Sequence, residues 1–180
     1  MIDFAKISYL RSGTKRQKEA YIELIELGLL DDLASYSPIL VGTIPIDIDV
    51  PDSDLDIICQ VSDHRRFKED VLRLYGQQSS FSIATRSFQK KPVTITKFKG
   101  RNFPIELFAQ DTPTRQQYGY LHMMIEHRLL KKYGESMKLA VRQLKQVSGL
   151  STEEAFASIL GLKGDPYEAL LQLDLPDPIH

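Results

Sequence analysis

The chain contains one cysteine, Cys59, and no stretch of apolar residues that approaches the ~18 needed to span a membrane. A single cysteine excludes an internal disulfide framework and every zinc motif built from several cysteines. No long apolar core precedes the first charged residues, so the sequence predicts a cytoplasmic protein. An excess of charge of one sign is lacking too, because the formal net charge is −1, and this argues against a surface devoted to coating nucleic acid.

The sequence also lacks internal repeats, low-complexity tracts and any linker rich in Pro, Gly and Ser. Its 180 residues, 42% hydrophobic and 26% charged, have the length and composition of one globular domain that buries its own core. We therefore predict a single domain over 1–180, with N-terminal helices at 1–36, a sheet at 37–111 and a helical part at 112–180. The oligomeric state stays open.

Hydrophobic periodicity predicts an α+β fold, in which a mixed sheet of about five strands is packed with helices and followed by a helical C-terminal part. Alternating apolar residues indicate strands, and apolar residues three or four apart indicate helices. The expected strands are 39–41, 54–61, 80–88, 92–99 and 103–110, the last three as an antiparallel meander. The expected helices before residue 111 are 3–11, 15–30 and 63–75.

Three or four helices are expected after residue 111. Thr112 as N-cap and Pro113 in the first turn predict the start of the first one. Its apolar stripe is expected at Tyr118, Leu121, Ile125 and Leu129. Two capping boxes, Ser151 with Glu154 and Asp165 with Glu168, predict later helix starts.

The strand at 54–61 carries the candidate site. Its apolar residues alternate on one face, so Asp54 and Asp56 point together from the other face. Adjacent carboxylates repel unless they are hydrated or bridged by divalent cations, and ligands that are all oxygen select hard ions such as Mg²⁺ or Mn²⁺. Gly42 and Thr43, at the end of the preceding strand, allow the backbone to approach a ligand closely and offer a hydroxyl to a phosphate oxygen.

This arrangement of Gly42-Thr43, a loop of ten residues and Asp54-Leu55-Asp56 resembles the signature of the polymerase-β-like nucleotidyltransferase superfamily. A wider resemblance, to an uncharacterised bacterial family of that superfamily known only as a domain of unknown function, rests on GTIPIDIDVPDSDLDIICQV, YLHMMIEHRLL and GLKGDPYEALL and covers nearly the whole chain. Two departures are visible. Thr43 stands where the superfamily usually has Ser, which keeps the hydroxyl, and Pro104 requires its strand to begin there or to lie next to an edge.

The resemblance implies transfer of a nucleoside monophosphate from a nucleoside triphosphate to an acceptor hydroxyl, with release of pyrophosphate. It implies that Asp54 and Asp56 hold two Mg²⁺ (or Mn²⁺) ions, and that Glu106 completes one metal site and helps to activate the hydroxyl. Gly42 and Thr43 would hold the phosphates. The acceptor stays open among a small molecule, a protein and RNA. The alternatives are a catalytically silent nucleotide- or metal-binding protein of the same fold, and an interaction protein whose acids only decorate the surface.

Asp47-Ile48-Asp49 is a second Asp-x-Asp pattern, but Pro45 and Pro51 bracket it, so we expect a loop or an exposed ribbon there and favour the later pair. The basic residues of the segment 86–101 include an alternating row, and in this row Lys97 and Lys99 are candidates for binding the triphosphate. The same row fits an edge strand that protects itself from aggregation.

His122 and Glu126 lie one helical turn apart. We favour a partly buried histidine satisfied by this neighbour over a catalytic or metal-binding one. Cys59 is expected to be a small core residue. Tyr118, Tyr120 and Tyr133 are candidates for the core or for a rim on which bases stack.

Overall fold

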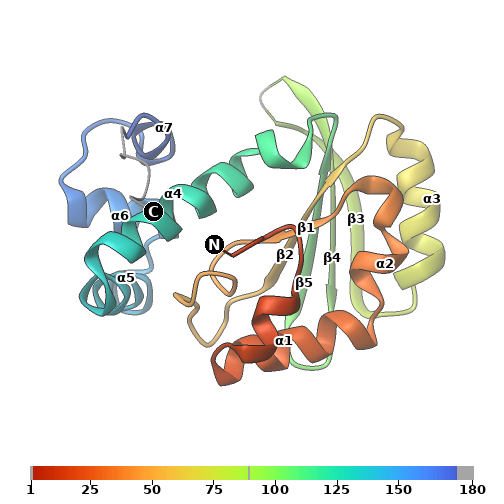
Figure 1. Cartoon of the computed structure of the whole chain (residues 1–180). Coiled ribbons are helices and arrows are strands. Elements are labelled where there is room, and N and C mark those ends of the chain that lie inside the picture. The colour runs from red at the N-terminus through yellow and green to blue at the C-terminus, as the bar shows by residue number, and fades with distance from the viewer. Residues whose placement is uncertain (1, 89, 174–180) are drawn as a thin grey trace.

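The structure, a computed structural model, describes residues 2–88 and 90–173 and is built around one mixed sheet (Figure 1). The strands lie in the order β1-β2-β5-β4-β3, with β2 and β5 parallel and all other neighbours antiparallel. Their bounds are β1 Ile39–Val41, β2 Leu55–Gln60, β3 Ser79–Phe88, β4 Lys91–Lys99 and β5 Pro104–Gln110. The predicted α+β class, the five strands and the meander are confirmed. The strand β5 begins at Pro104, where a missing amide hydrogen costs no ladder bond.

The N-terminal helices differ from the prediction. The segment 15–30 forms two helices, α1 (Lys15–Glu26) and α2 (Leu29–Asp32), because Gly28 between them adopts the left-handed conformation with φ of 64°. The helix expected at 3–11 is wrong, since the chain forms only a short 3-10 helix at Ser8–Ser12. A run this short before Gly13 cannot repay the cost of nucleating an α-helix.

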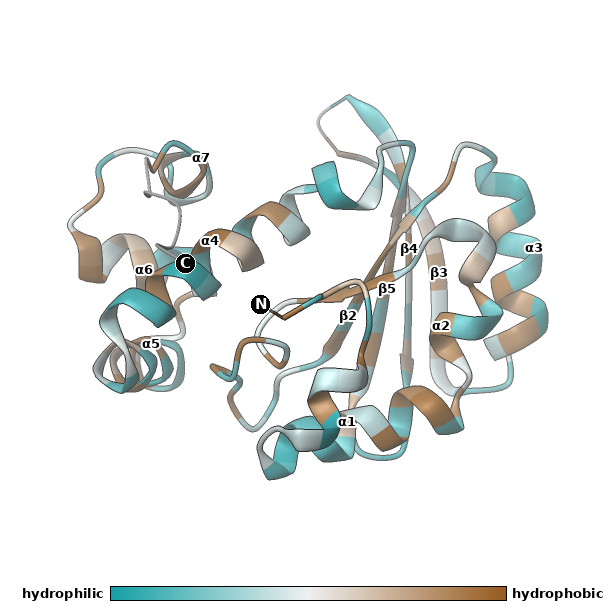
Figure 2. Ribbon diagram, viewed as in Figure 1, coloured by the Kyte–Doolittle hydropathy of each residue, from teal (hydrophilic) through white to brown (hydrophobic). Residues whose placement is uncertain are grey.

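The helices α2 and α3 (His64–Tyr75) lie on one side of the sheet, and α1 runs past the lower ends of the strands and joins the same core (Figure 1). Asp63 caps α3 by accepting hydrogen bonds from the amides of Arg65 and Arg66. The strands turn their apolar side chains toward these helices, and Figure 2 shows the apolar colour on β2 and β5 and mostly polar colour on α3. The core on this side includes Leu55, Ile57, Cys59, Phe67, Val71, Ile105, Leu107 and Ala109. Cys59 is fully buried in it, as predicted.

The opposite face of the sheet looks toward the helical C-terminal part. Because successive residues of a strand point to opposite faces, this face receives Asp56 and Ile58 from β2 and Glu106 and Phe108 from β5. A second core cluster joins Ile58 and Val41 to the C-terminal helices. These helices are α4 Tyr118–Tyr133, α5 Glu135–Ser148, α6 Thr152–Leu160 and α7 Pro166–Leu171.

The helix starts after residue 111 confirm the prediction only in part. Thr112 and Pro113 do not begin α4, because a 3-10 turn at Thr114–Gln116 comes first. The capping box of Ser151 and Glu154 is present at α6. At α7, the Asp165 side chain accepts a hydrogen bond from the Glu168 amide, as predicted. The Glu168 carboxylate instead accepts a hydrogen bond from the hydroxyl of Tyr118.

The buried face of α4 shares only Leu129 with the predicted stripe, and Tyr118, Leu121 and Ile125 are half-buried. The side chains that α4 buries are His122, Met123, Glu126, Leu129 and Leu130. Hydropathy alone misses this face, because two of its members are titratable. Within residues 2–88 and 90–173, none of the helices combines the length and apolar character that crossing a bilayer requires.

Candidate functional site

A cleft of about 860 Å³ lies between the open face of the sheet and the C-terminal helices. Residues of β1, β2 and β5, with Phe88 at the end of β3, form its sheet wall, and residues of α4, α5, α6 and α7 form its helical wall. Pockets of this size accommodate a nucleotide or a drug-sized ligand. The cleft therefore has a wall from each half of the fold.

Three carboxylates gather on the sheet wall. Asp56 of β2 and Glu106 of β5 are direct register partners on neighbouring parallel strands, so their side chains project from the same face. Asp54 precedes β2 and lines the same cleft. The three residues predicted to form the site thus meet at one place in the fold.

The pKa of Asp56 reflects the burial of this residue and the charges around it. Burial, followed by repulsion from Asp54 and Glu106, raises the pKa of Asp56 to about 8. The positive charges of Lys97 and Lys145 lower it by less. A cation bound beside these carboxylates would relieve their repulsion and favour the ionised form of Asp56.

Glu106 is engaged by a lysine. Its Oε2 atom lies 2.5 Å from Nζ of Lys97, the register partner of Glu106 on β4. This carboxylate raises the pKa of Lys97 above its usual value, through the hydrogen bond first and its charge second. Among the residues that the structure describes, no group of three or more His, Cys, Asp or Glu side chains is arranged to hold a metal ion.

Gly42 fits against Asp56 in a way that only glycine allows. Its φ is +82°, and a Cβ atom built on it would lie 2.5 Å from Oδ2 of Asp56. Thr43, also in the cleft, directs its hydroxyl to Ser53 Oγ at 3.3 Å. Ser53 additionally accepts a hydrogen bond from the amide of Val50 at 2.9 Å, which fixes the turn before Asp54.

The two lysines predicted to bind phosphate are not among the residues that line the cleft. Lys97 pairs with Glu106, and Lys99 lies at the far end of β4, opposite Pro104. The strand β4 is not an edge, because β3 and β5 flank it. The interpretation of this row as edge protection is therefore wrong.

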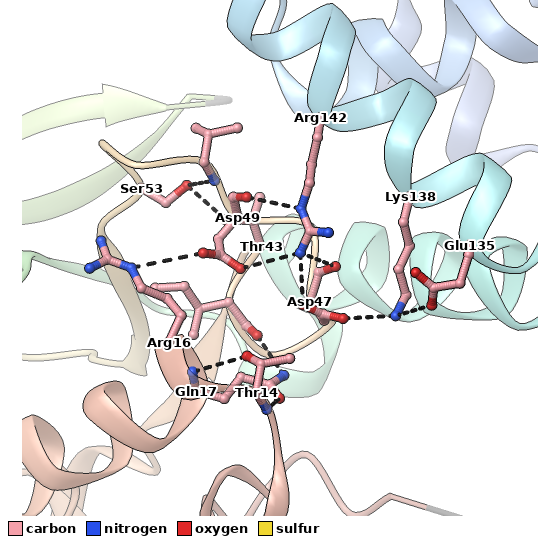
Figure 3. Close-up of polar contacts among 12 residues, drawn as sticks. Thr14, Arg16, Gln17, Thr43, Asp47, Asp49, Ser53, Glu135, Lys138 and Arg142 are labelled. Atoms are coloured by element: carbon pink, nitrogen blue, oxygen red, sulfur yellow. Dashed lines mark hydrogen bonds and ion pairs between the residues drawn. The ribbon is translucent and has the colours of Figure 1, made fainter.

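Asp47 and Asp49, the second Asp-x-Asp pair, lie in a loop, as predicted, and hold a helix (Figure 3). Arg142 of α5 donates to the Asp47 carboxylate at 2.7 Å and to the backbone oxygens of Asp47 and Asp49 at 2.9 and 3.2 Å. Lys138 reaches the other Asp47 oxygen at 2.8 Å. Asp47 also adopts a φ of +57°, so this pair shapes the loop instead of facing the cleft.

His122 is buried, but its partner is not the predicted one. Its Nε2 atom lies 3.0 Å from the backbone oxygen of Tyr167, and its Nδ1 atom lies 3.6 Å from Oε1 of Glu153. Glu126 is only 3% exposed, and its Oε1 atom is buried with no hydrogen-bond partner in the part of the chain that the structure describes. Burial first, and Glu153 second, raise the pKa of Glu126 to about 8.

Sequence reasoning missed Lys145, Ser53 and Glu153 as residues of the cleft. Lys145 is the only Lys or Arg among the described residues that line it, and burial lowers the pKa of Lys145 despite Glu126, Glu153, Asp56 and Asp54 nearby. Ser53 was adjacent to the motif and could have been found there. Lys145 and Glu153 could not, because only the packing of α5 and α6 brings them to the strands.

Comparison with solved structures identifies the fold. The Cid1 RNA terminal uridylyl transferase matches with a TM-score of 0.55 and 12% identity, over 86% of this chain and 52% of that one. The GLD-2/RNP-8 complex gives 0.54 and 11%, over 86% and 61%. The polymerase core of TRAMP, an RNA surveillance complex, gives 0.53 and 13%, over 91% and 50%.

These values establish the nucleotidyltransferase fold, and the chain spans little more than half the length of the solved chains that it matches. No curated protein matches the sequence. The sequence model of one family does match, over residues 22–173. The chain belongs to that family, DUF4269, a domain of unknown function.

Proposed function

We propose that the protein is a nucleotidyltransferase that transfers a nucleoside monophosphate from a nucleoside triphosphate to an acceptor hydroxyl. The observation that carries this proposal is the register of Asp56 beside Glu106, with Asp54 next to them, at the wall of a cleft large enough for a nucleotide. The nucleotidyltransferase fold supports it.

The chemistry of the donors fits Mg²⁺. All are carboxylate oxygens, which hard divalent ions prefer, and their mutual repulsion leaves a demand for positive charge at Asp56. Asp54 and Asp56 would hold the ions, and Glu106 would join them on leaving Lys97. When bound, the ions would supply charge stabilisation for the entering and leaving oxygens.

The remaining parts of the cleft support the phosphate side of the reaction. Gly42 keeps the backbone close to Asp56, and Thr43 and Ser53, whose hydroxyls are bonded to each other, line the same space. Lys145 enters from the helical wall as a cation for the triphosphate. In the reaction, the acceptor oxygen bonds to the α-phosphorus while the bond to the bridging oxygen breaks, and pyrophosphate leaves with the electron pair. The hydroxyl proton goes to a carboxylate of the site, a role that Glu106 would take on leaving Lys97.

The test is calorimetric titration of each nucleoside triphosphate, with Mg²⁺ or Mn²⁺, into the wild type and into an Asp54→Asn/Asp56→Asn variant. Metal-dependent binding by the wild type alone is expected. Equal binding, or none, by the two proteins would sink the proposal. Neutral Asn keeps the shape of the carboxylate and removes its charge, so the comparison isolates the metal-binding charge.

A second candidate is a nucleotide-binding protein without turnover, which the pairing of Glu106 with Lys97 favours. It predicts nucleotide binding but no transfer of label from an α-labelled nucleotide to any acceptor. Release of labelled pyrophosphate from a γ-labelled nucleotide would exclude this candidate.

A further inference from the structure

The cleft is strongly acidic. Its sheet wall bears Asp52, Asp54, Asp56 and Glu106, and its helical wall bears Glu126, Glu153 and Glu168, against Lys145 as the only Lys or Arg of the described lining. Proteins that track a nucleic-acid backbone use a positively charged groove. This balance therefore disfavours an RNA strand along the helical wall.

The helical wall also holds a carboxylate that the protein leaves unsatisfied. Glu126 lines the cleft. Its Oε1 atom is buried and has no hydrogen-bond partner among the described residues. A buried polar atom without a partner costs free energy, so such an atom in a native protein serves catalysis, stores strain, or is completed by a water, an ion or a ligand. A cationic donor would satisfy this atom and favour the ionised form of Glu126, because an ionised carboxylate only accepts.

Neighbouring groups define that donor. Glu153, at the start of α6, lines the same cleft as Glu126, and its charge raises the pKa of Glu126. Of the basic groups beside them, Lys145 donates to Thr152 at 2.5 Å, and Nδ1 of His122 lies 3.6 Å from Oε1 of Glu153. On the proposed function, Lys145 turns its charge to the triphosphate, which leaves Glu126 and Glu153 in need of a cation from elsewhere.

Aromatic rings stand beside these carboxylates. Tyr118, His122 and Tyr167 contact one another in sequence, with ring centroids 5.6 and 5.8 Å apart, and the ring of Tyr167 is 39% exposed. Carboxylates next to aromatic faces are the chemistry that recognises an ammonium group. A neutral base would stack on the same rings but would leave the acidic charge uncompensated.

We propose that Glu126 and Glu153 bind a protonated amine of the acceptor, so that the acceptor is a small hydroxyl compound bearing amino groups. That the bound amine belongs to the acceptor rests on the proposed function. The amine site itself stands on the helical wall alone. Amine binding is non-covalent and involves residues of the helical wall only, so it can be tested without nucleotide or metal.

The experiment is calorimetric titration of neamine, a polyamino pseudodisaccharide, into the full chain without nucleotide or metal. Maltose, uncharged and similar in size, is the matched ligand, and a decameric uridine RNA and free adenosine are competitors. The Glu126→Gln and Glu153→Gln variants remove one charge each at constant shape. The control is Glu69→Gln, which removes an exposed carboxylate of α3 that lies outside the cleft.

The expected result is binding of neamine but not maltose, weakened about tenfold or more by each cleft variant and unchanged by the control. Absence of neamine binding, equal binding of maltose, tighter binding of RNA or adenosine, or insensitivity to both cleft variants would overturn the inference. Because Glu153 lies in the first turn of α6 and is partly exposed, its variant keeps the test valid if Glu126→Gln fails to fold.

Failure of this inference and failure of the proposed function give different results. Metal-dependent nucleotide binding without neamine binding retains the nucleotidyltransferase and overturns the amine acceptor. Neamine binding without nucleotide binding rejects the nucleotidyltransferase and with it the acceptor role.

Discussion

Gly42 shows how one missing side chain positions a carboxylate. A methyl group at this residue meets Oδ2 of Asp56 at 2.5 Å, and the φ of +82° adds backbone strain. We expect Gly42→Ala to lower the free energy of unfolding by about 1–3 kcal/mol more than a strain-only control. It should also abolish metal-dependent nucleotide binding. Urea denaturation and calorimetry measure the two effects.

The strain-only control is Gly149→Ala. Gly149 has a φ of +64° and open space around its Cβ position, so this variant carries the backbone cost without the contact. Equal destabilisation by the two variants, with nucleotide binding retained in both, would show that the close approach of Gly42 to Asp56 has no role.

Glu126 makes stability depend on pH. Burial first and Glu153 second raise its pKa to about 8, against about 4.3 in an unfolded chain, while Lys145 opposes the shift. The folded state therefore keeps a proton that the unfolded state loses. Stability from this group is full below about pH 4 and falls as the pH rises toward 8. The other titratable groups around Glu126 are Lys145, Glu153 and His122, and Glu126→Gln leaves them unchanged.

Glu126→Gln removes that dependence. At pH 8 we expect the variant to have a free energy of unfolding higher than that of the wild type by on the order of a few kcal/mol, and therefore a higher Tm. This difference should close near pH 4. Thermal melts across this range measure it, with Glu69→Gln as a reference for loss of an exposed carboxylate. A gap that stays constant with pH would contradict the assignment.

At the scale of elements, the sequence predicted strands far better than helix ends. Apolar alternation at Leu55, Ile57 and Cys59 is a local signal, and the strand followed it. The break at Gly28 and the late start of α4 depend on backbone conformations that hydropathy does not encode. Asp54 and Asp56 were visible as a motif, and Glu106 only through the resemblance. Glu126 and Lys145 became site residues through helix packing, which no local pattern reports.

The loop 43–53 is an element whose shape depends on the helical part (Figure 3). Arg142 makes its hydrogen bonds to this loop from α5 with a side chain only 28% exposed. We expect Arg142→Ala to lower the free energy of unfolding by about 2–3 kcal/mol, because charged hydrogen bonds are lost and Asp47 keeps only Lys138. Nucleotide affinity should fall as well, since Thr43 and Ser53 belong to the loop.

Arg65→Ala is the matched control for that variant. It removes an exposed Arg65–Glu69 pair within α3, and such pairs contribute about 0.5 kcal/mol or less. Urea denaturation compares the two. If both arginines prove equally dispensable, the loop does not depend on α5.

At the scale of the whole molecule, both halves contribute charged groups to one cleft. The sheet supplies Asp54, Asp56 and Glu106, and the helical part supplies Lys145. The site is therefore complete only when the C-terminal helices pack against the sheet, as the second core cluster has them do. A triphosphate that spans the cleft would join the carboxylates through metal ions at one end and Lys145 at the other.

Lys145→Met tests this division of charge, because methionine keeps the apolar stem and removes the ammonium. We expect affinity for a nucleoside triphosphate analogue with Mg²⁺ to fall about tenfold or more, as the loss of one charged contact implies. Neamine affinity should hold or rise, because Glu126 and Glu153 lose their competing cation. Lys131→Met, which removes an exposed lysine of α4 outside the cleft, is the control and should change neither affinity.

Calorimetry with both ligands measures the four combinations. A fall in both affinities in Lys145→Met would mean that the lysine only supports the packing of α5 and α6, whereas a selective fall in nucleotide affinity would tie the helical half directly to the phosphates.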